Sequence, residues 1–302
     1  MSIDSDLAKW RLILKRERLA SRTISFYAET AHAVLGLMEA RGLRTDPRTI
    51  GPDDIGELLD YLADMDYTIQ TRKGYLSTLR KLCRAFRNKT VDDWPRPRFP
   101  HDNRPNVDWL EADQARELLD TDKTPIQTIV VHLELCLGLR HVEVIRLKTG
   151  DIDEEARTLY VRGKGPEGGK PRIIPYAKGT DEAIREWRIR RDQMAAYGRR
   201  RYPVTFEDPE ELIVWARAGR LYPYSEEGYG LDKVVTIPLP EKLGFHFSNH
   251  TLRRTFGRAL YRASVPVATI AAILGHESTD VTLKYIGVNL DDMRAAMGAD
   301  LF

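Results

Sequence analysis

The chain has 302 residues, of which 42% are hydrophobic and 30% charged, and its formal net charge is +2. This length allows two domains with buried cores, and the lack of any apolar run near about 18 residues argues against a membrane-spanning helix. The polar opening from Met1 to Asp6 has no signal-peptide pattern. We therefore expect a cytoplasmic protein with no membrane partner.

Residues 1–89 are predicted to form a compact helical domain. Apolar residues recur at helical spacing in four segments, near residues 10–14, 24–38, 55–62 and 75–86. The fourth segment has a basic face, made of Arg72, Lys73, Arg80, Arg84 and Arg87. A face of this kind suits contact with DNA phosphates, although solvated basic faces are also common.

Residues 90–107 are predicted to be a basic linker. Four prolines make a regular helix improbable there: Pro95, Pro97, Pro100 and Pro105. Three arginines between them extend the basic stripe: Arg96, Arg98 and Arg104. A second basic cluster lies further on, at Arg188, Arg190, Arg191, Arg199, Arg200 and Arg201. Both clusters favour a nucleic-acid partner.

Residues 108–302 are predicted to form an α-rich second domain with a small antiparallel sheet. The segments 157–161 and 172–175 indicate two strands joined by a glycine-rich turn. An apolar helix breaks at Gly138, and a new helix begins near Arg140. Gly275 ends a helix, and Ser278 or Thr279 caps the next one.

Four fragments of this domain carry residue types that suit cleavage of a phosphodiester. They are Gly138-Leu139-Arg140, Gly163-Lys164-Gly165, His250-Thr251-Leu252-Arg253 and Leu274-Gly275-His276, followed nine residues later by Tyr285. Guanidinium groups bind the non-bridging oxygens of a phosphate in bidentate geometry, which stabilises the dianionic transition state. A tyrosine can act as the covalent nucleophile. The sequence therefore predicts phosphoryl transfer through Arg140, Arg253 and Tyr285.

The other polar residues of these fragments are candidates for proton transfer. Lys164 can protonate the departing 5′ oxygen, while His250 and His276 can move protons or hydrogen-bond the phosphate. His246 and His250 have no nearby Cys or acid to complete a zinc site. The glycines around Lys164 lack the context of a nucleotide-binding loop. We therefore expect no metal and no other cofactor.

Together the fragments resemble the motifs of the tyrosine recombinase family, also called lambda-integrase-like. Arg140 is followed three residues later by Glu143, as in the family's first box, and His250 and Arg253 match its His-x-x-Arg box. The resemblance covers roughly residues 109–290. It implies a helical core-binding (SAM-like) domain and a catalytic domain with the DNA breaking-rejoining enzyme fold. It also implies that Arg140, Lys164, His250, Arg253, His276 and Tyr285 are the catalytic residues.

Two features depart from the family's pattern. The turn after Lys164 is longer than usual, so Lys170 competes with Lys164 for the role of general acid. The family often has histidine after its second arginine, whereas this chain has Arg254. The resemblance assigns that position no catalytic role.

The resemblance implies a site-specific recombinase of the two-domain, Xer-like type, associated with the nucleoid. Such an enzyme cleaves and rejoins duplex DNA through a 3′-phosphotyrosyl intermediate and a Holliday junction. It is expected to be monomeric in solution and tetrameric on synapsed sites. A C-terminal tail helix bears an apolar stripe of Ile286, Leu290, Met293 and Met297. This stripe packs either on its own domain or, as the resemblance implies, on a neighbouring protomer. A type IB topoisomerase and a catalytically silent DNA-binding relative are the alternatives. The sequence names neither the DNA site nor the biological outcome.

Overall fold

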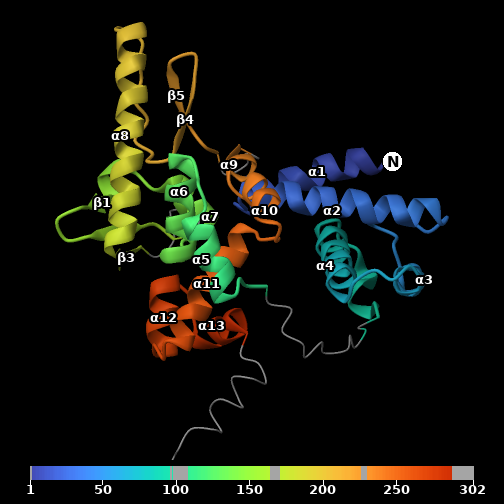
Figure 1. The fold of residues 1–302 in the computed structure, drawn as a ribbon. Helices are drawn as coiled ribbons and strands as arrows, with labels where there is room; N and C mark the ends of the chain where they lie inside the picture. The colour runs from blue at the N-terminus through green and yellow to red at the C-terminus, as the bar shows by residue number, and fades with distance from the viewer. Residues whose placement is uncertain (1, 96, 98–107, 164–170, 226–229, 288–302) are drawn as a thin grey trace, which may run out of the picture. The chain divides into compact units, whose positions relative to one another are not determined.

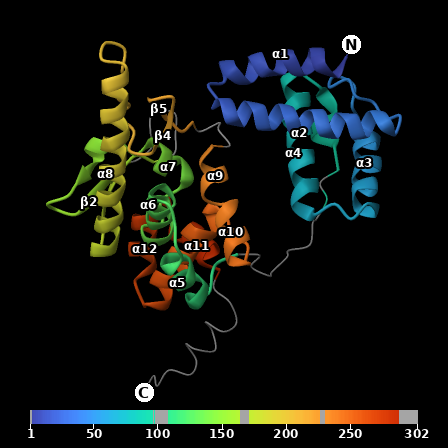
Figure 2. The same ribbon diagram turned by 45° about the horizontal axis from the view of Figure 1, so that its top comes forward.

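The computed structural model describes residues 2–95, 97, 108–163, 171–225 and 230–287. The chain divides into two compact units, Met1–Asp102 and Asn103–Phe302 (Figures 1 and 2). Each unit has a hydrophobic core of its own. The finer limits expected from the sequence, at residues 89 and 107, stay a prediction.

The first unit is a set of helices. They are α1 (Ile3–Arg16), α2 (Ser21–Ala40), α3 (Pro52–Asp64) and α4 (Ile69–Ala85), followed by a 3-10 turn at Lys89–Asp93. Ser2 and Thr68 begin α1 and α4, because their side-chain oxygens accept hydrogen bonds from backbone amides of the first turn. The four helices that the apolar spacing predicted are thus present.

The core of the first unit takes one large residue from each helix: Trp10, Leu35, Leu58 and Leu79. Val91 and Trp94, which lie in the segment expected to be linker, are buried in the same core. The Asn88 amide donates to the carbonyl oxygen of Ile50 at 2.8 Å and so fixes the chain after α4. Packing of the first unit therefore continues beyond residue 89.

The second unit is also mainly helical. Its helices are α5 (Ala112–Asp120), α6 (Pro125–Val131), α7 (His141–Arg146), α8 (Lys178–Arg201), α9 (Gly230–Val234), α10 (Pro238–Leu243), α11 (Asn249–Arg262), α12 (Val267–Leu274) and α13 (Thr279–Ile286). A π-helical segment, His132–Cys136, follows α6 and packs against α11. Short π-helical segments are frequent at functional sites. This segment leads directly to Gly138 and Arg140.

Two small antiparallel sheets complete the second unit. One has the order β1 (Ile152–Asp153), β2 (Thr158–Val161), β3 (Arg172–Pro175), and the other pairs β4 (Val214–Arg217) with β5 (Arg220–Pro223). Val161 pairs with Arg172 at the end of β2 and β3 where the chain passes from one strand to the other. The two strands predicted around the glycine-rich turn are confirmed, while Lys164 and Lys170 lie outside the described residues.

The mainly α-helical fold with small antiparallel sheets is confirmed. Over the ranges that the structure describes, no helix is long and apolar enough to cross a membrane. The last described element is α13, followed by Gly287 in the left-handed conformation. Ile286, the first residue of the apolar stripe expected for the tail, is buried with Ile270 and Leu274 in a core of its own unit, and the rest of the tail lies outside the described residues.

Candidate active site

Arg140 lies at the N-terminus of α7, beside a sharp break in the chain. Gly138 has φ +63°, and a Cβ there would lie 2.3 Å from the ring of Phe256, so the position requires glycine. The Arg140 guanidinium donates to Glu143 Oε1 at 3.0 Å and to the carbonyl oxygen of Gly275 at 3.2 Å. A quarter of the Arg140 side chain stays exposed. The Arg140 side chain is therefore still accessible to an anion from solvent.

Glu143 is the fully buried centre of the cluster. Arg172 on β3 donates to both of its carboxylate oxygens, at 2.9 and 2.8 Å, and the Arg140 backbone amide donates to Oε2 at 2.8 Å. Burial alone would raise the pKa of Glu143, but the hydrogen bonds and positive charge of Arg172 outweigh burial and lower it. Glu143 is therefore an ionised acid that orients arginines.

Arg253 on α11 is almost completely buried, with 2% of its surface exposed. Its guanidinium donates to the carbonyl oxygens of Gly138 and Leu274 and lies 3.6 Å from Glu143 Oε2. Burial, followed by the nearby charge of Arg140, lowers the pKa of Arg253 to about 10. The side chain is still a cation at neutral pH. It is also held in one orientation, which is what preorganised charge stabilisation requires.

His276 follows α12, which ends at Gly275 in the left-handed conformation. Its Nδ1 lies 2.9 Å from the Thr282 hydroxyl, and its Nε2 lies 3.3 Å from the Arg253 guanidinium. Because Thr282 donates to the Ser278 carbonyl oxygen, Nδ1 carries the proton and Nε2 accepts from Arg253. Burial and then the charge of Arg253 lower the pKa of His276 to about 4. The imidazole is neutral at physiological pH.

Tyr285 on α13 completes the cluster. Its ring meets the His276 ring edge-on with 5.0 Å between centroids, and the Arg253 Cζ lies 5.8 Å from its centre. The hydroxyl is buried and makes no hydrogen bond of normal geometry within the described part of the chain. Burial raises the pKa of Tyr285, and the charge of Arg253 opposes that rise. The phenol is thus a shielded, protonated group beside a fixed cation.

Arg254 is a further neighbour of Tyr285. Its Cζ lies 5.5 Å from the centre of the Tyr285 ring, and its charge lowers the pKa of the phenol. The Arg254 Nε is buried and finds no acceptor among the residues that the structure covers. The arginine that replaces the family's usual histidine therefore contacts the expected nucleophile.

The structure brings together four of the six expected catalytic residues: Arg140, Arg253, His276 and Tyr285. His250 is exposed in the first turn of α11, one turn before Arg253. Lys164 falls outside the described residues. Sequence analysis missed Arg172, whose only signal was its position at the start of the second strand of the hairpin.

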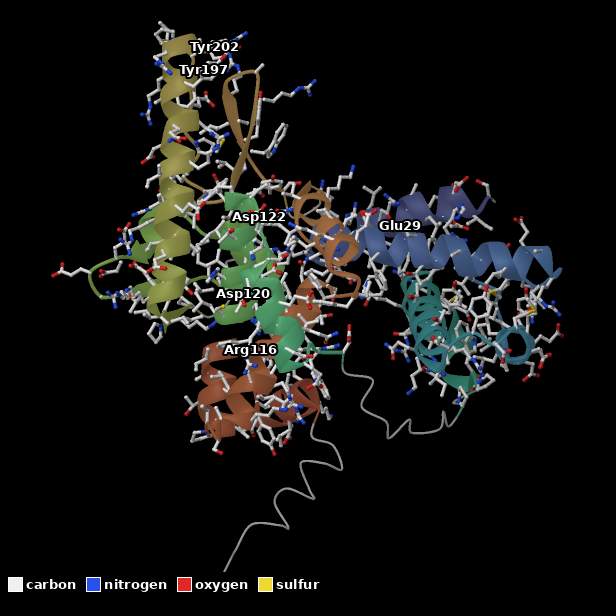
Figure 3. The ribbon with its side chains drawn as sticks, viewed as in Figure 1. Glu29, Arg116, Asp120, Asp122, Tyr197 and Tyr202 are labelled. Carbon is white, nitrogen blue, oxygen red and sulfur yellow. The ribbon has the colours of Figure 1, made fainter. Side chains whose placement is uncertain are left out.

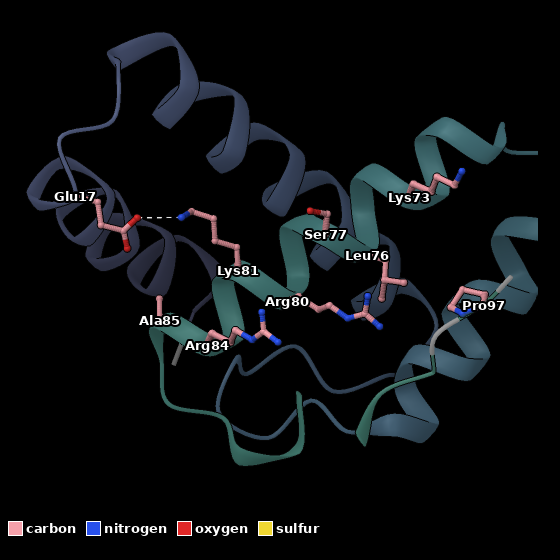
Figure 4. Close-up of a pocket in the computed structure, with 9 residues that line it drawn as sticks. All are labelled: Glu17, Lys73, Leu76, Ser77, Arg80, Lys81, Arg84, Ala85 and Pro97. Carbon is pink, nitrogen blue, oxygen red and sulfur yellow. Dashed lines mark hydrogen bonds and ion pairs between the residues drawn. The ribbon is translucent and has the colours of Figure 1, made fainter. Parts of the chain in front are cut away.

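The basic face of α4 belongs to the first unit and lines a pocket (Figure 4). Arg80 donates to the Pro95 carbonyl oxygen at 2.8 Å, and Arg84 pairs with Asp92 at 2.9 Å on the surface. Lys73 and Arg87 are exposed, while the Arg72 Nε donates to the backbone of Tyr67. The linker arginines Arg96, Arg98 and Arg104 lie outside the described residues. Four of the nine residues that line the pocket are thus cations, and one of these, Lys81, pairs with the single acid of the lining, Glu17.

Comparisons with known proteins identify the family of the chain. Residues 108–291 match the model of the phage integrase family. Tyrosine recombinase XerA of Saccharolobus solfataricus is 22% identical over 83% of this chain and 79% of its own length. Tyrosine recombinase XerC of Syntrophus aciditrophicus is 29% identical over 55% of this chain. The match spans about half the length of that XerC.

Solved structures have the same fold. The Tn1549 transposon integrase in complex with a circular intermediate DNA has a TM-score of 0.66 and 18% identity, covering 98% of this chain and 99% of that one. A lambda integrase dimer bound to a core site has a TM-score of 0.64 and 19% identity, covering 95% of each chain. At these identities the likeness concerns the fold.

Proposed function

The chain belongs to the phage integrase family, and we propose that it is a tyrosine-type site-specific DNA recombinase. The observation that carries the proposal is the packing of Tyr285 against Arg253 and His276. Arg253 and Arg140 both form ion pairs with one buried acid, Glu143. A buried phenol beside two oriented guanidinium groups suits attack on a phosphodiester. The substrate is duplex DNA, and the intermediate is a 3′-phosphotyrosyl ester.

In the proposed reaction, Arg140 and Arg253 bind the non-bridging oxygens of the scissile phosphate. The Tyr285 oxygen forms a bond to phosphorus, while the bond to the 5′ oxygen breaks and its electron pair leaves with that oxygen. His276 and His250 are candidate acceptors for the phenol proton. His276 must first release the hydrogen bond that its Nε2 accepts from Arg253. Attack by a second 5′ hydroxyl reverses these steps on a partner strand and leads through a Holliday junction.

The departing 5′ oxygen needs a proton, which we assign to Lys164 with Lys170 as the alternative. A substrate with sulfur at the 5′-bridging position tests this assignment, because a thiolate leaves without a proton. Cleavage of that substrate should be restored in Lys164→Ala but not in Arg140→Ala. Restored cleavage in Lys170→Ala instead would move the general acid to Lys170.

We further propose that the basic face of α4 contacts the phosphates of the recombination site, and that four copies of the chain assemble on two synapsed sites. The cationic lining of the pocket in Figure 4 supports the first point. Solved structural neighbours are complexes with DNA, which supports a DNA partner for this chain. Mass photometry of the protein with one half-site, and then with two complete sites, would test the expected change from monomer to tetramer.

Covalent attachment to a nicked substrate tests the activity itself. Footprinting around the gene first locates a bound site, and a nick placed next to the scissile phosphate then traps the intermediate. The wild-type chain should form a denaturant-resistant DNA adduct, and Tyr285→Phe should form none while it still binds the site. Tyr261→Phe is the matched control, since Tyr261 packs in the same small core as Tyr285. An adduct in Tyr285→Phe would refute the nucleophile, and no adduct in the wild-type chain would refute the function.

A further inference from the structure

The last turns of α8 and the β4–β5 hairpin form an arm, residues 192–223, at the end of the second unit away from α12 and α13 (Figures 1 and 2). The first half of α8 packs in the main core through Ile184 and Trp187. Near its end, the helix instead packs against the hairpin. A Cβ on Gly198 would lie 2.1 Å from the Phe206 ring and 2.5 Å from the Gly219 oxygen.

The tip of the arm is held together by specific contacts between the hairpin turn and the end of α8. Ala218 and Gly219 form the hairpin turn with φ values of +52° and +86°. The Tyr202 hydroxyl donates to the Ala218 carbonyl oxygen at 3.0 Å and so ties the turn to the segment after α8. A Cβ on Gly219 would come within 2.9 Å of the Arg201 side chain. Helix and turn therefore meet at contact distance and hold the tip in place.

Five exposed arginines surround this tip: Arg199, Arg200, Arg201, Arg217 and Arg220. Two of them are ordered by tyrosines, which lie at the top of α8 in Figure 3. Arg201 donates to the hydroxyls of Tyr197 and Tyr202, both at 3.1 Å, and the Arg220 Cζ lies 4.5 Å from the centre of the Tyr202 ring. These contacts fix the guanidinium planes and leave their charge uncompensated.

The arm also carries five acidic residues, and among the residues described only one of them, Asp208, forms an ion pair with an arginine of the tip. Arg199 pairs with Asp208 at 2.6 Å, whereas Arg200 and Arg217 have no hydrogen bond or ion pair among the residues described. Arg217 and Arg220 are directly opposite each other in the hairpin. Like charges at paired positions of a β-ribbon destabilise it, so this pair has a cost that a bound anion would relieve.

We propose that the tip of the arm binds the phosphate backbone of duplex DNA. The bound phosphates lie in the DNA that flanks the stretch cleaved by Tyr285. The inference rests on the proposed function and extends it to flanking DNA. Guanidinium groups held on aromatic rings are suited to phosphate, and the DNA major groove can admit a two-stranded ribbon. The eleven residues from Arg191 to Arg201 span ~15 Å along the helix, the length of roughly four base pairs.

A double charge reversal tests the proposal. The tip variant is Arg200→Glu with Arg217→Glu, and the control variant is Arg116→Glu with Lys178→Glu, which makes the same change in net charge at exposed positions of the second unit outside the arm. Arg217→Glu places opposite charges across the hairpin, so thermal unfolding should show an unchanged or higher Tm. If the Tm falls, the neutral pair Arg200→Gln and Arg217→Gln replaces the tip variant.

Binding is measured by anisotropy on random-sequence duplexes of about 16 and about 36 base pairs as salt is varied. On the longer duplex, the tip variant should lose up to ~2 units of the slope of log affinity against log salt, since each phosphate contact contributes about 0.9. It should behave like the wild-type chain on the shorter duplex. It should also form the covalent adduct at the wild-type rate when DNA is saturated with protein.

The outcomes separate this inference from the proposed function. A wild-type chain that forms no adduct refutes the function and the inference together. A normal adduct with equal slopes for wild type and tip variant on the longer duplex refutes the inference alone. An equal loss of slope in the control variant would mean that net charge matters and the arm does not. If the tip variant bound DNA normally but no longer associated with other copies of the chain, the arm would be a protein-binding surface and the inference would be wrong.

Discussion

Arginine is prominent in both units of the chain, but the two units hold it in different ways. In the second unit, Arg253 is buried, and its guanidinium is bound to two carbonyl oxygens beside Glu143. In the first unit, Arg84 on α4 has one surface ion pair, and Arg87 is exposed. A guanidinium that is held in one orientation can stabilise the negative charge that develops in the transition state. An exposed surface cation instead adds affinity for DNA, and dissolved salt screens this contribution.

This difference separates two measurable roles. Fixed arginines should affect the rate of cleavage more than binding, because their geometry matters most in the transition state. Surface arginines should affect binding and its salt dependence, because they neutralise phosphates one at a time. The following changes test that separation.

Removal of a fixed arginine should have the largest effect. Arg140→Ala and Arg253→Ala should each slow formation of the covalent adduct by ~10²-fold or more, in line with loss of a preorganised donor to the oxyanion. Site binding should weaken much less. Single-turnover cleavage with saturating protein measures the chemical step, and gel shift measures binding. Wild-type cleavage by either variant would make that arginine a structural ion-pair residue.

Loss of Arg172 should mainly reduce stability. Arg172→Met removes the bidentate partner of buried Glu143 and should cost on the order of 3 kcal/mol of unfolding free energy. The surface pair Arg262–Glu111 provides the control, and Arg262→Ala should cost less than about 1 kcal/mol. Denaturant unfolding measures both values. Similar values for the two variants would mean that the ion pair between Arg172 and Glu143 adds little to stability.

The same pair predicts a pH dependence. The folded pKa of Glu143 lies below its ordinary value of 4.5. The stability that it contributes is therefore present above about pH 4.5 and is lost as the pH falls through the folded pKa. In Arg172→Met the lowering is smaller, so the acid loss of stability should be shallower than in the wild-type chain. Identical slopes below about pH 4.5 would assign that loss to other groups.

Arg172 shows where prediction from sequence ends. Helical spacing and capping residues predicted α12, α13 and the chain break before Arg140, because these features depend on near neighbours in sequence. The bond between Arg172 and Glu143 joins residues 29 apart in sequence, and it depends on how β3 packs beside α7. The contact of Arg254 with Tyr285 likewise depends on how α11 packs against α13. Family motifs predicted the candidate reacting groups but not these supporting contacts.

Neutralising the α4 face should produce an effect on binding alone. Replacing Arg80, Arg84 and Arg87 by glutamine should reduce the slope of log affinity against log salt by up to ~3 units. The adduct rate at saturating protein should stay near that of the wild-type chain. The control is a triple variant on α1, in which glutamine replaces Arg11, Lys15 and Arg16. These are exposed positions of the same unit. Equal slopes in both triple variants would assign the effect to net charge.

Arg254 provides the smallest and most specific test, because it lies between the two classes of arginine. It is half-buried, and its Cζ lies 5.5 Å from the centre of the Tyr285 ring. Its charge favours the phenolate, so Arg254→Met should raise the pKa of Tyr285 further and shift the rise of cleavage rate with pH to higher pH. Arg254→Lys keeps a cation and should restore part of the shift.

A purely structural role for Arg254 would give a different result. The methionine variant would then lose Tm and cleavage rate in equal measure at every pH, and lysine would not restore the profile. The pH series on the nicked substrate therefore distinguishes a charge that tunes the nucleophile from a side chain that fills space. A fixed charge within the cluster can act on Tyr285 without contacting DNA, whereas the exposed arginines of α4 act only through the phosphates that they reach.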